Sequence, residues 1–328
     1  MKRVAIGILL VLLVLTLASF IGGQAQKAVE SAAQPTGNGA PPLANPLKVA
    51  LLKWYKANET THFPVGNQPY GVCFDGQNIW TANFGADTVT KLRASDGEVL
   101  GTFQAGVEPY GVTFDGANIW VSNVGSNNVY KLRASDGKNL GIFQTGVSPT
   151  WMAFDGANIW VPNGANLLTK LRASDGKNLG NFTVGNSPFQ AAFDGKNVWV
   201  TNGVDNTVTE LRASDGQVVG TFKTGAGPIG VAFDGANIWT ANNGDGTVSK
   251  LRARDGTLVG TFGTPISPYG IAFDAADIWV TGEYVYELLD SDGTRILFKN
   301  PGTNTVGAAF DGANMWIAGT NDNEVGKF

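Results

Sequence analysis

The sequence predicts an all-β repeat fold, and three observations support that prediction. A Phe-Asp pair, followed closely by Ile, Val or Met and then Trp, recurs every 37–40 residues, at Phe74, Phe114, Phe154, Phe193, Phe233, Phe273 and Phe310. Between these anchors lie short β-branched and aromatic runs that end in Asp-Gly, Asn or Gly, a pattern typical of strands and hairpin turns. The 44 glycines argue against a helical solenoid of similar period. About forty residues in four strands is the length of one propeller blade, so we expect a seven-bladed β-propeller.

The second repeat unit shows how each blade is built. Its four pieces, strands A to D, lie within residues 109–116, 117–123, 128–137 and 139–146. Asp-Gly pairs at 115–116 and 136–137 predict tight A–B and C–D hairpins. We therefore expect the uniform A–B and C–D turns on one face of the disc. The more variable D–A and B–C connections should lie on the other face, around the mouth of the central channel.

The two ends of the repeat array predict that the ring closes. Residues 324–328 match strand C, and no strand D follows them. Residues 61–69 align instead with strand D of the first full repeat and the loop after it, at 101–109. The N-terminal strand should therefore complete the last blade, which removes an open sheet edge.

The N-terminus has the features of an export signal. Lys2 and Arg3 precede an apolar run over residues 4–21, and small residues follow. We assign 1–25 as a signal peptide, with an uncleaved membrane anchor as the alternative. Residues 26–50 are rich in Ala, Pro and Gly and read as a flexible linker, which leaves 51–328 for the propeller. The expected location is secreted, periplasmic or at the cell surface.

Composition excludes several classes of function. The net charge is −4 and no basic stripe is visible, so a nucleic-acid partner is not expected. Cys73 and His62 are the only cysteine and the only histidine, which excludes an internal disulfide, Cys-based zinc sites and multi-histidine metal sites. We expect a monomer without a cofactor, and we assign no catalytic or metal-binding residue.

The repeat pattern resembles that of known exported bacterial propellers. Pro-Tyr-Gly-Val-x-Phe-Asp-Gly, Ile-Trp-Val-x-Asn and Val-x-Lys-Leu look like NHL/YVTN-type repeats, and the resemblance covers roughly residues 59–328. The pattern is also similar to the streptogramin (virginiamycin B) lyase superfamily, which is built on a seven-bladed scaffold. That likeness implies Mg²⁺ and a histidine base inside the ring. His62 falls in the closing outer strand, so the motif cannot be transferred, although Mg²⁺ or Ca²⁺ in the channel stays open.

Residues that recur in every unit are interpreted as structural. The repeat tryptophans should pack between blades rather than form a sugar platform. The Phe-Asp-Gly aspartates should accept backbone hydrogen bonds in their turns rather than ring a metal. Cys73 occupies a slot that otherwise holds small residues, so we expect a buried, inert thiol.

Residues that vary between units are the candidate ligand-binding residues. Inner-strand positions near the channel mouth hold Tyr70, Tyr110, Phe189 and Tyr269, while Trp151 and Gln190 replace a glycine present in five units. A second set follows each repeat Trp by three residues and either supports the turn or presents amides to a ligand: Asn83, Asn123, Asn163, Asn202 and Asn242. Glu283, in the irregular sixth blade, is the acidic candidate on the rim.

The expected function is that of an exported, non-catalytic binding or scaffold propeller. Its variable face and channel mouth would bind a ligand, a cell-wall glycan or a protein, because function on such regular folds lies in the loops. Two alternatives stay open: a metal-dependent lyase or lactonase, and a structural component of a surface layer.

Overall fold

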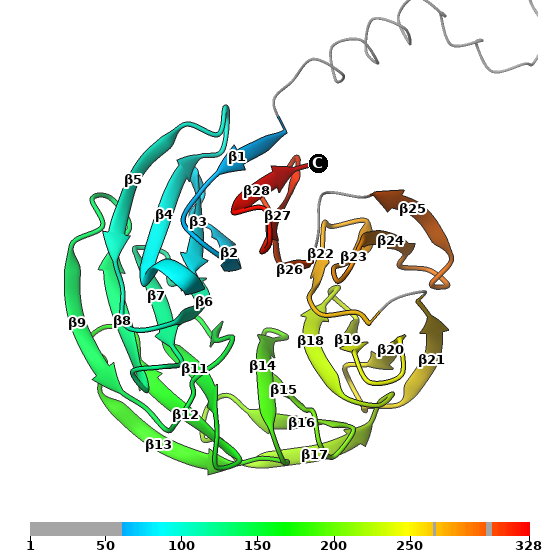
Figure 1. Ribbon diagram of the computed structural model, residues 1–328. Coiled ribbons are helices and arrows are strands. Elements are labelled where there is room, and N and C mark those ends of the chain that lie inside the picture. Colours follow the sequence, from blue (N-terminus) through cyan, green and yellow to red (C-terminus); the bar gives the residue numbers. More distant parts are fainter. Residues whose placement is uncertain (1–60, 265–266, 300–303) are drawn as a thin grey trace, which may run out of the picture. The chain divides into compact units, whose positions relative to one another are not determined.

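Seven four-stranded antiparallel sheets form a ring in the computed structural model, which describes residues 61–264, 267–299 and 304–328 (Figure 1). Thr60–Phe328 is one compact unit. The all-β, seven-bladed prediction is confirmed. The predicted signal peptide, linker and propeller start at residue 51 lie outside the described residues. Within the described part of the chain, no helix is long and apolar enough to cross a membrane.

The first four blades follow the predicted order of strands A to D. Their strands are β2(Pro69–Phe74), β3(Asn78–Asn83), β4(Thr88–Arg93), β5(Val99–Gln104); β6(Pro109–Phe114), β7(Asn118–Asn123), β8(Asn128–Arg133), β9(Asn139–Gln144); β10(Ala153–Phe154), β11(Asn158–Asn163), β12(Leu167–Arg172), β13(Asn178–Thr183); and β14(Pro188–Phe193), β15(Asn197–Asn202), β16(Thr207–Arg212), β17(Val218–Lys223). A 3₁₀ turn, η1(Phe84–Ala86), lies in the first B–C connection.

Blades five and six repeat the pattern, and blade seven combines strands from both ends of the described chain. The strands are β18(Pro228–Phe233), β19(Asn237–Asn242), β20(Thr247–Arg252), β21(Leu258–Gly263); β22(Ile271–Phe273), β23(Asp277–Val280), β24(Val285–Leu289), β25(Arg295–Lys299); and β26(Thr305–Phe310), β27(Met315–Gly319), β28(Glu324–Lys327), with β1(His62–Pro64). Strand A is shortened in blade three to β10, and in blade six to β22.

Ring closure occurs as the sequence predicts. β1 is the outermost strand of blade seven and pairs antiparallel with β28, with Phe63 opposite Val325 (Figure 1). The Phe63 ring lies 5.4 Å from the Trp316 ring and packs in a cluster that also contains Ile79 and Leu92 of blade one. The closing strand therefore connects the last blade to the first through the core.

An aspartate and a tryptophan form the same internal support in every blade. In blade two, Asp115 Oδ1 accepts the backbone N–H groups of Ala117 and Asn118, and Oδ2 accepts the Trp120 indole N–H at 2.7 Å. The indole–aspartate bond recurs in all seven blades at 2.7–2.8 Å. This arrangement confirms the turn role predicted for the aspartates.

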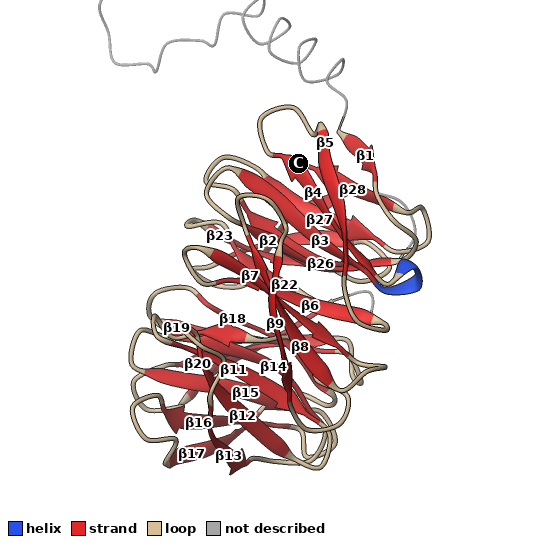
Figure 2. Cartoon of the chain, turned by 90° about the vertical axis from the view of Figure 1, so that its left-hand side faces the viewer, coloured by secondary structure: helices blue, strands red, loops and turns tan. Residues whose placement is uncertain are grey.

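The tryptophans fill the space between neighbouring blades. Trp80 of blade one packs in a cluster with Val112, Ile119 and Leu132 of blade two, and the other interfaces repeat this contact. Their interior position confirms packing and leaves no aromatic platform at this repeat position. Each interface between blades therefore has its own buried cluster, and Figure 2 shows the stacked blades from the side.

Backbone hydrogen bonds place the loops on the predicted faces. In blade one, the D–A connection meets the B–C connection through Phe84 N–H to Gln68 O. On the other face, Ala94 of the C–D turn donates to Gln77 of the A–B turn. The variable D–A and B–C connections therefore share one face, which we call the variable face, and the uniform turns share the other.

Candidate binding surface at the channel mouth

An aromatic cluster occupies the channel mouth on the variable face. Its buried members are Tyr110, Trp151 and Val306, and around them pack Tyr70, Phe84, Val124, Phe189, Ile229 and Tyr269. All seven blades contribute to this cluster through their inner strands or the adjacent connections. Residues more than 200 positions apart in the sequence, such as Tyr70 and Val306, therefore belong to one cluster. The structure thereby brings together the five predicted aromatic candidates.

Tyr110 lies at the centre of this aromatic cluster. Its ring centroid is 4.9 Å from that of Tyr70 and 4.6 Å from that of Trp151. Its hydroxyl shares a 2.6 Å hydrogen bond with the hydroxyl of Tyr269, contributed by blade six. Rings from blades one, two, three and six are thus held in one rigid group.

The exceptional residues of blades three and four change the backbone. Trp151 forms an isolated parallel bridge with Gln190, in which Trp151 N–H donates to Phe189 O at 3.2 Å and Ala191 N–H donates to Trp151 O at 3.1 Å. The inner segment of blade three therefore pairs with the neighbouring blade, and β10 keeps two residues in its own sheet. The Gln190 side chain continues the link, because its Oε1 accepts the N–H of Val231 in blade five at 3.3 Å.

Crowding of the inner strands explains why glycine occupies this position elsewhere. A Cβ built on Gly71 would lie 2.6 Å from the Tyr110 carbonyl oxygen, and one on Gly270 would lie 2.1 Å from that of Val306. Trp151 is accommodated because its strand has moved out of the regular sheet. A small cavity of about 80 Å³ beneath the cluster is lined by Trp151, Gln190 and inner-strand aliphatic residues.

The tyrosines of the cluster are held in their neutral form. Burial, followed by the neighbouring Tyr269 hydroxyl, raises the pKa of Tyr110 above its ordinary value. Burial also raises the pKa of Tyr269 and of Tyr70. At neutral pH these phenols therefore offer ring faces and O–H groups, but no phenolate base.

The five candidate asparagines are buried and do not form part of this surface. Each is fully buried at the end of strand B and bonds within its own blade; Asn83 Nδ2, for example, donates to Thr90 Oγ1 at 2.8 Å. In blade two, Asn123 Oδ1 accepts the N–H of Gly106 in the D–A loop. This placement matches the turn-supporting alternative.

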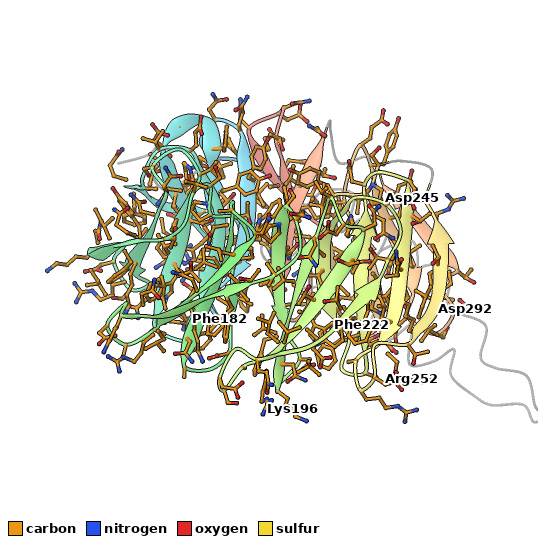
Figure 3. All side chains as sticks on the ribbon, turned by 90° about the horizontal axis from the view of Figure 1, so that it is seen from below. Phe182, Lys196, Phe222, Asp245, Arg252 and Asp292 are labelled. Atoms are coloured by element: carbon orange, nitrogen blue, oxygen red, sulfur yellow. The ribbon has the colours of Figure 1, made fainter. Side chains whose placement is uncertain are left out.

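The rim around the cluster is acidic. The D–A and B–C connections contain no lysine or arginine, and they carry Asp87, Glu108, Asp205, Asp245, Glu283 and Asp322. Asp87, Asp205 and Asp245 accept backbone N–H groups and so brace their loops. Figure 3 shows Asp245 on the face opposite Lys196 and Arg252. The predicted candidate Glu283 is exposed on this rim.

His62 and Cys73 lie outside the cluster. His62 is exposed in β1, on the outer edge of blade seven, as predicted. Cys73 is partly buried in the core between blades one and two, where burial and then the Asp75 charge raise the pKa of its thiol. The thiol is therefore protonated at neutral pH, as expected of an inert cysteine.

Sequence reasoning missed several residues that matter here. Phe84 and Val124 complete the aromatic cluster from B–C connections, and Ile229 and Val306 do so from inner strands. A further missed signal is a lysine in the middle of strand C, which is replaced by Glu210 in blade four and by Glu287 in blade six. Comparing the aligned repeats position by position would have shown that exchange.

Comparison with solved structures shows the fold that this chain shares. It is similar to a streptogramin B lyase structure, with a TM-score of 0.69 and 18% identity over 81% of this chain and 95% of that chain. It is also similar to virginiamycin B lyase from Staphylococcus aureus, with a TM-score of 0.68 and 18% identity over 81% and 97% of the two chains. A third similar structure is hydrazine synthase of Kuenenia stuttgartiensis, with a TM-score of 0.68 and 16% identity over 80% of this chain and 95% of that chain.

These structural similarities define the fold class of the protein. The protein is a seven-bladed β-propeller with the fold of streptogramin B lyase. No protein-family model and no curated protein sequence matches the chain. At this identity the shared fold carries no assignment of activity.

Proposed function

We propose that this protein is a binding or scaffold propeller that holds a positively charged polypeptide partner against its variable face. The observation that carries this proposal is an aromatic cluster at the channel mouth, surrounded by loops with six carboxylates and no lysine or arginine. Aromatic faces and carboxylates both attract lysine and arginine side chains.

The rim also offers apolar contact. Val107, Val147 and Val204 stand in the same connections and are 50%, 53% and 70% exposed. A surface that combines half-buried rings, exposed aliphatic groups and negative charge suits a polypeptide with both cationic and apolar side chains. The export predicted from residues 1–25 would place this face outside the cytoplasm.

The test compares three synthetic twelve-residue peptides that share two tryptophans and differ in carrying four Lys, four Gln or four Glu. Fluorescence anisotropy should show the Lys peptide binding at least about tenfold more tightly than the Gln peptide, with an affinity that falls as salt rises. Phe189→Ala should weaken that binding about five- to tenfold. Leu258→Ala, which removes an exposed side chain from an outer strand, is the matched control and should bind normally.

Two results would overturn the proposal. One is equal binding of all three peptides together with preferential binding of a chitin-derived tetrasaccharide. The other is turnover of a lactone or cyclic depsipeptide that is lost with EDTA and in Glu283→Gln, which would favour the enzymatic alternative.

A further inference from the structure

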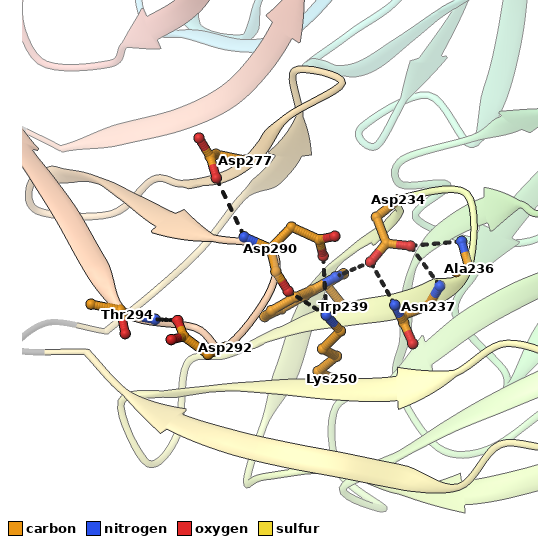
Figure 4. A network of polar contacts seen from close by, with 9 residues as sticks. All are labelled: Asp234, Ala236, Asn237, Trp239, Lys250, Asp277, Asp290, Asp292 and Thr294. Carbon is orange, nitrogen blue, oxygen red and sulfur yellow. Dashed lines mark hydrogen bonds and ion pairs between the residues drawn. The ribbon is translucent and has the colours of Figure 1, made fainter. Parts of the chain in front are cut away.

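The carboxylates of the uniform-turn face are bonded within the protein, and Figure 4 shows this at the interface of blades five and six. Asp234 accepts the Trp239 indole N–H at 2.7 Å, and Asp290 pairs with Lys250 at 3.1 Å. Asp292 accepts a backbone N–H of its own turn at 2.8 Å. Carboxylates that are available to a ligand therefore have to be sought on the variable face.

Two carboxylates of the acidic rim, those of Glu108 and Glu283, have no polar partner. Among residues 61–264, 267–299 and 304–328, neither side chain forms an ion pair or accepts a hydrogen bond. The rim aspartates Asp87, Asp205 and Asp245 instead accept backbone N–H groups of their loops. Glu108 is half-buried and Glu283 is exposed, so both can pair with a cation that arrives from solvent.

Glu283 stands at a position that belongs to the aromatic cluster in other blades. It follows the repeat Trp of its blade by four residues, and the residues at that place in blades one and two are Phe84 and Val124. Both of these side chains pack in the aromatic cluster. Blade six also contributes Tyr269, whose N–H donates at 2.7 Å to the carbonyl oxygen of Thr281, two residues before Glu283. The glutamate therefore places a carboxylate at the blade-six edge of the aromatic cluster.

Glu108 places a second carboxylate at the blade-two edge of the aromatic cluster. It precedes Tyr110 by two residues, and its carbonyl oxygen accepts the N–H of Val124 at 3.0 Å. Its side chain lies over Gly125, because a Cβ built there would be 3.0 Å from Oε2. Blade one has Gln68 at the equivalent position, so a neutral side chain of the same shape fits this place in the repeat.

The two glutamates lie on opposite sides of the aromatic cluster. Blades two and six are separated by blades one and seven on one side of the ring and by blades three to five on the other. Their tyrosines, Tyr110 and Tyr269, meet in the 2.6 Å hydrogen bond between hydroxyl groups. The half-buried Phe189 ring lies edge-to-face with both, at centroid distances of 6.1 and 6.0 Å. A path from one carboxylate to the other therefore crosses aromatic rings.

We propose that the partner polypeptide lies extended across the channel mouth, with one cationic side chain at Glu108, a second at Glu283 and an apolar or aromatic side chain between them on the aromatic cluster. This inference rests on the proposed function and adds the spacing of the cations in the partner. In an extended chain, residues two and four positions apart point to the same side, and four residues span about 13 Å. A Lys-x-Trp-x-Lys segment therefore directs both cations and the ring toward the propeller, where carboxylates and aromatic faces attract them.

Two synthetic nine-residue peptides of identical composition test this spacing. One contains Lys-x-Trp-x-Lys, and in the other the two lysines are adjacent and precede the Trp. Fluorescence anisotropy should show the spaced peptide binding to the wild-type protein at least about fivefold more tightly, because it engages both carboxylates at once. Glu108→Gln and Glu283→Gln should each weaken binding of the spaced peptide about two- to fivefold. The double variant should bind the two peptides equally.

Asp292→Asn is the matched control, because it removes one carboxylate from the uniform-turn face and should leave both affinities unchanged. Unchanged circular dichroism spectra would show that the glutamine variants keep the fold. Equal binding of the two peptides to the wild-type protein, or a spacing preference that persists in the double variant, would overturn this inference and leave the proposed function in place. Failure of both lysine peptides to bind would overturn the two together.

Discussion

At the scale of single residues, the aspartate–tryptophan pair is the repeated unit of stability. The Trp120 indole is fully buried and has Asp115 as the acceptor for its N–H. The same carboxylate satisfies two backbone N–H groups of the turn. One side chain therefore fixes both the hairpin and the orientation of the largest residue between two blades.

Asp115→Ala should lower the free energy of unfolding by about 2–4 kcal/mol, because it leaves the buried indole N–H and the turn amides without their acceptor. Asp136→Ala is the matched control in the same blade. Asp136 is exposed, pairs with Arg133 and accepts the backbone N–H of Lys138, so its loss should lower stability clearly less than the loss of Asp115. Urea denaturation of both variants measures the difference, and equal losses would contradict the structural role of the pair.

Departures from the repeat carry different information from the repeated residues. Trp151 and Gln190 each break a rule that most other blades obey, and both line the small cavity at the channel mouth. Local conflicts of this kind are expected where function or strain outweighs the common pattern. The repeated residues explain the scaffold, and these two exceptions lie at the surface for which we propose a binding role.

At the scale of structural elements, the inner strands are the most crowded part of the ring. Strand A of each blade approaches strand A of the next closely enough that several glycines have no room for a side chain. This close approach is a property of seven strands converging on one axis, so outer strands and loops do not share it.

Gly270→Ala should therefore destabilise the protein by at least about 1–3 kcal/mol, because its new Cβ would meet the Val306 carbonyl oxygen. Gly203→Ala serves as the comparison, since a Cβ there would make ordinary contacts of 3.5 Å or more. That change should alter stability by less than about 0.5 kcal/mol. Thermal unfolding followed by circular dichroism distinguishes them, and equal midpoints would argue against crowding at the axis.

At the scale of the whole molecule, a three-residue strand closes the ring. β1 pairs with β28, and Lys327 N–H donates to the Thr61 carbonyl oxygen. Phe63, 8% exposed, connects this strand to the core between blades seven and one. Because the contact joins residues far apart in the sequence, its loss should open the ring locally as well as weaken the packing.

Phe63→Ala should lower stability by about 2–4 kcal/mol and should also reduce the hydrogen-exchange protection of the Lys327 amide below that of the other blades. Phe143→Ala removes the equivalent ring from an internal blade, where Phe143 lies 5.4 Å from Trp120. Phe143→Ala should lower the free energy of unfolding by a similar amount and leave the Lys327 amide protected. Loss of Lys327 protection in both variants would show that closure depends on general stability rather than on β1.

The amino-acid sequence was enough to predict the repeat, the four strands of each blade, the closing strand and the two faces of the disc. These features follow from period, turn residues and alignment, because each repeat contains its own local signals. The sequence also placed Tyr70, Tyr110, Trp151, Phe189 and Tyr269 near the channel mouth. It could not show that they pack into one cluster, since that contact depends on the axis at which all blades meet.

The folded ring was needed to show which candidate residues share a surface and which are internal supports. The five asparagines fit both roles in the sequence and lie buried in the blades. In the sequence, Glu210 is a single exchange of lysine for glutamate within a strand. The structure shows that this glutamate is buried and accepts a hydrogen bond from Asn197. Contacts between neighbouring blades join residues about forty positions apart, and no local sequence signal specifies the charge, burial or unpaired oxygen atoms that meet there.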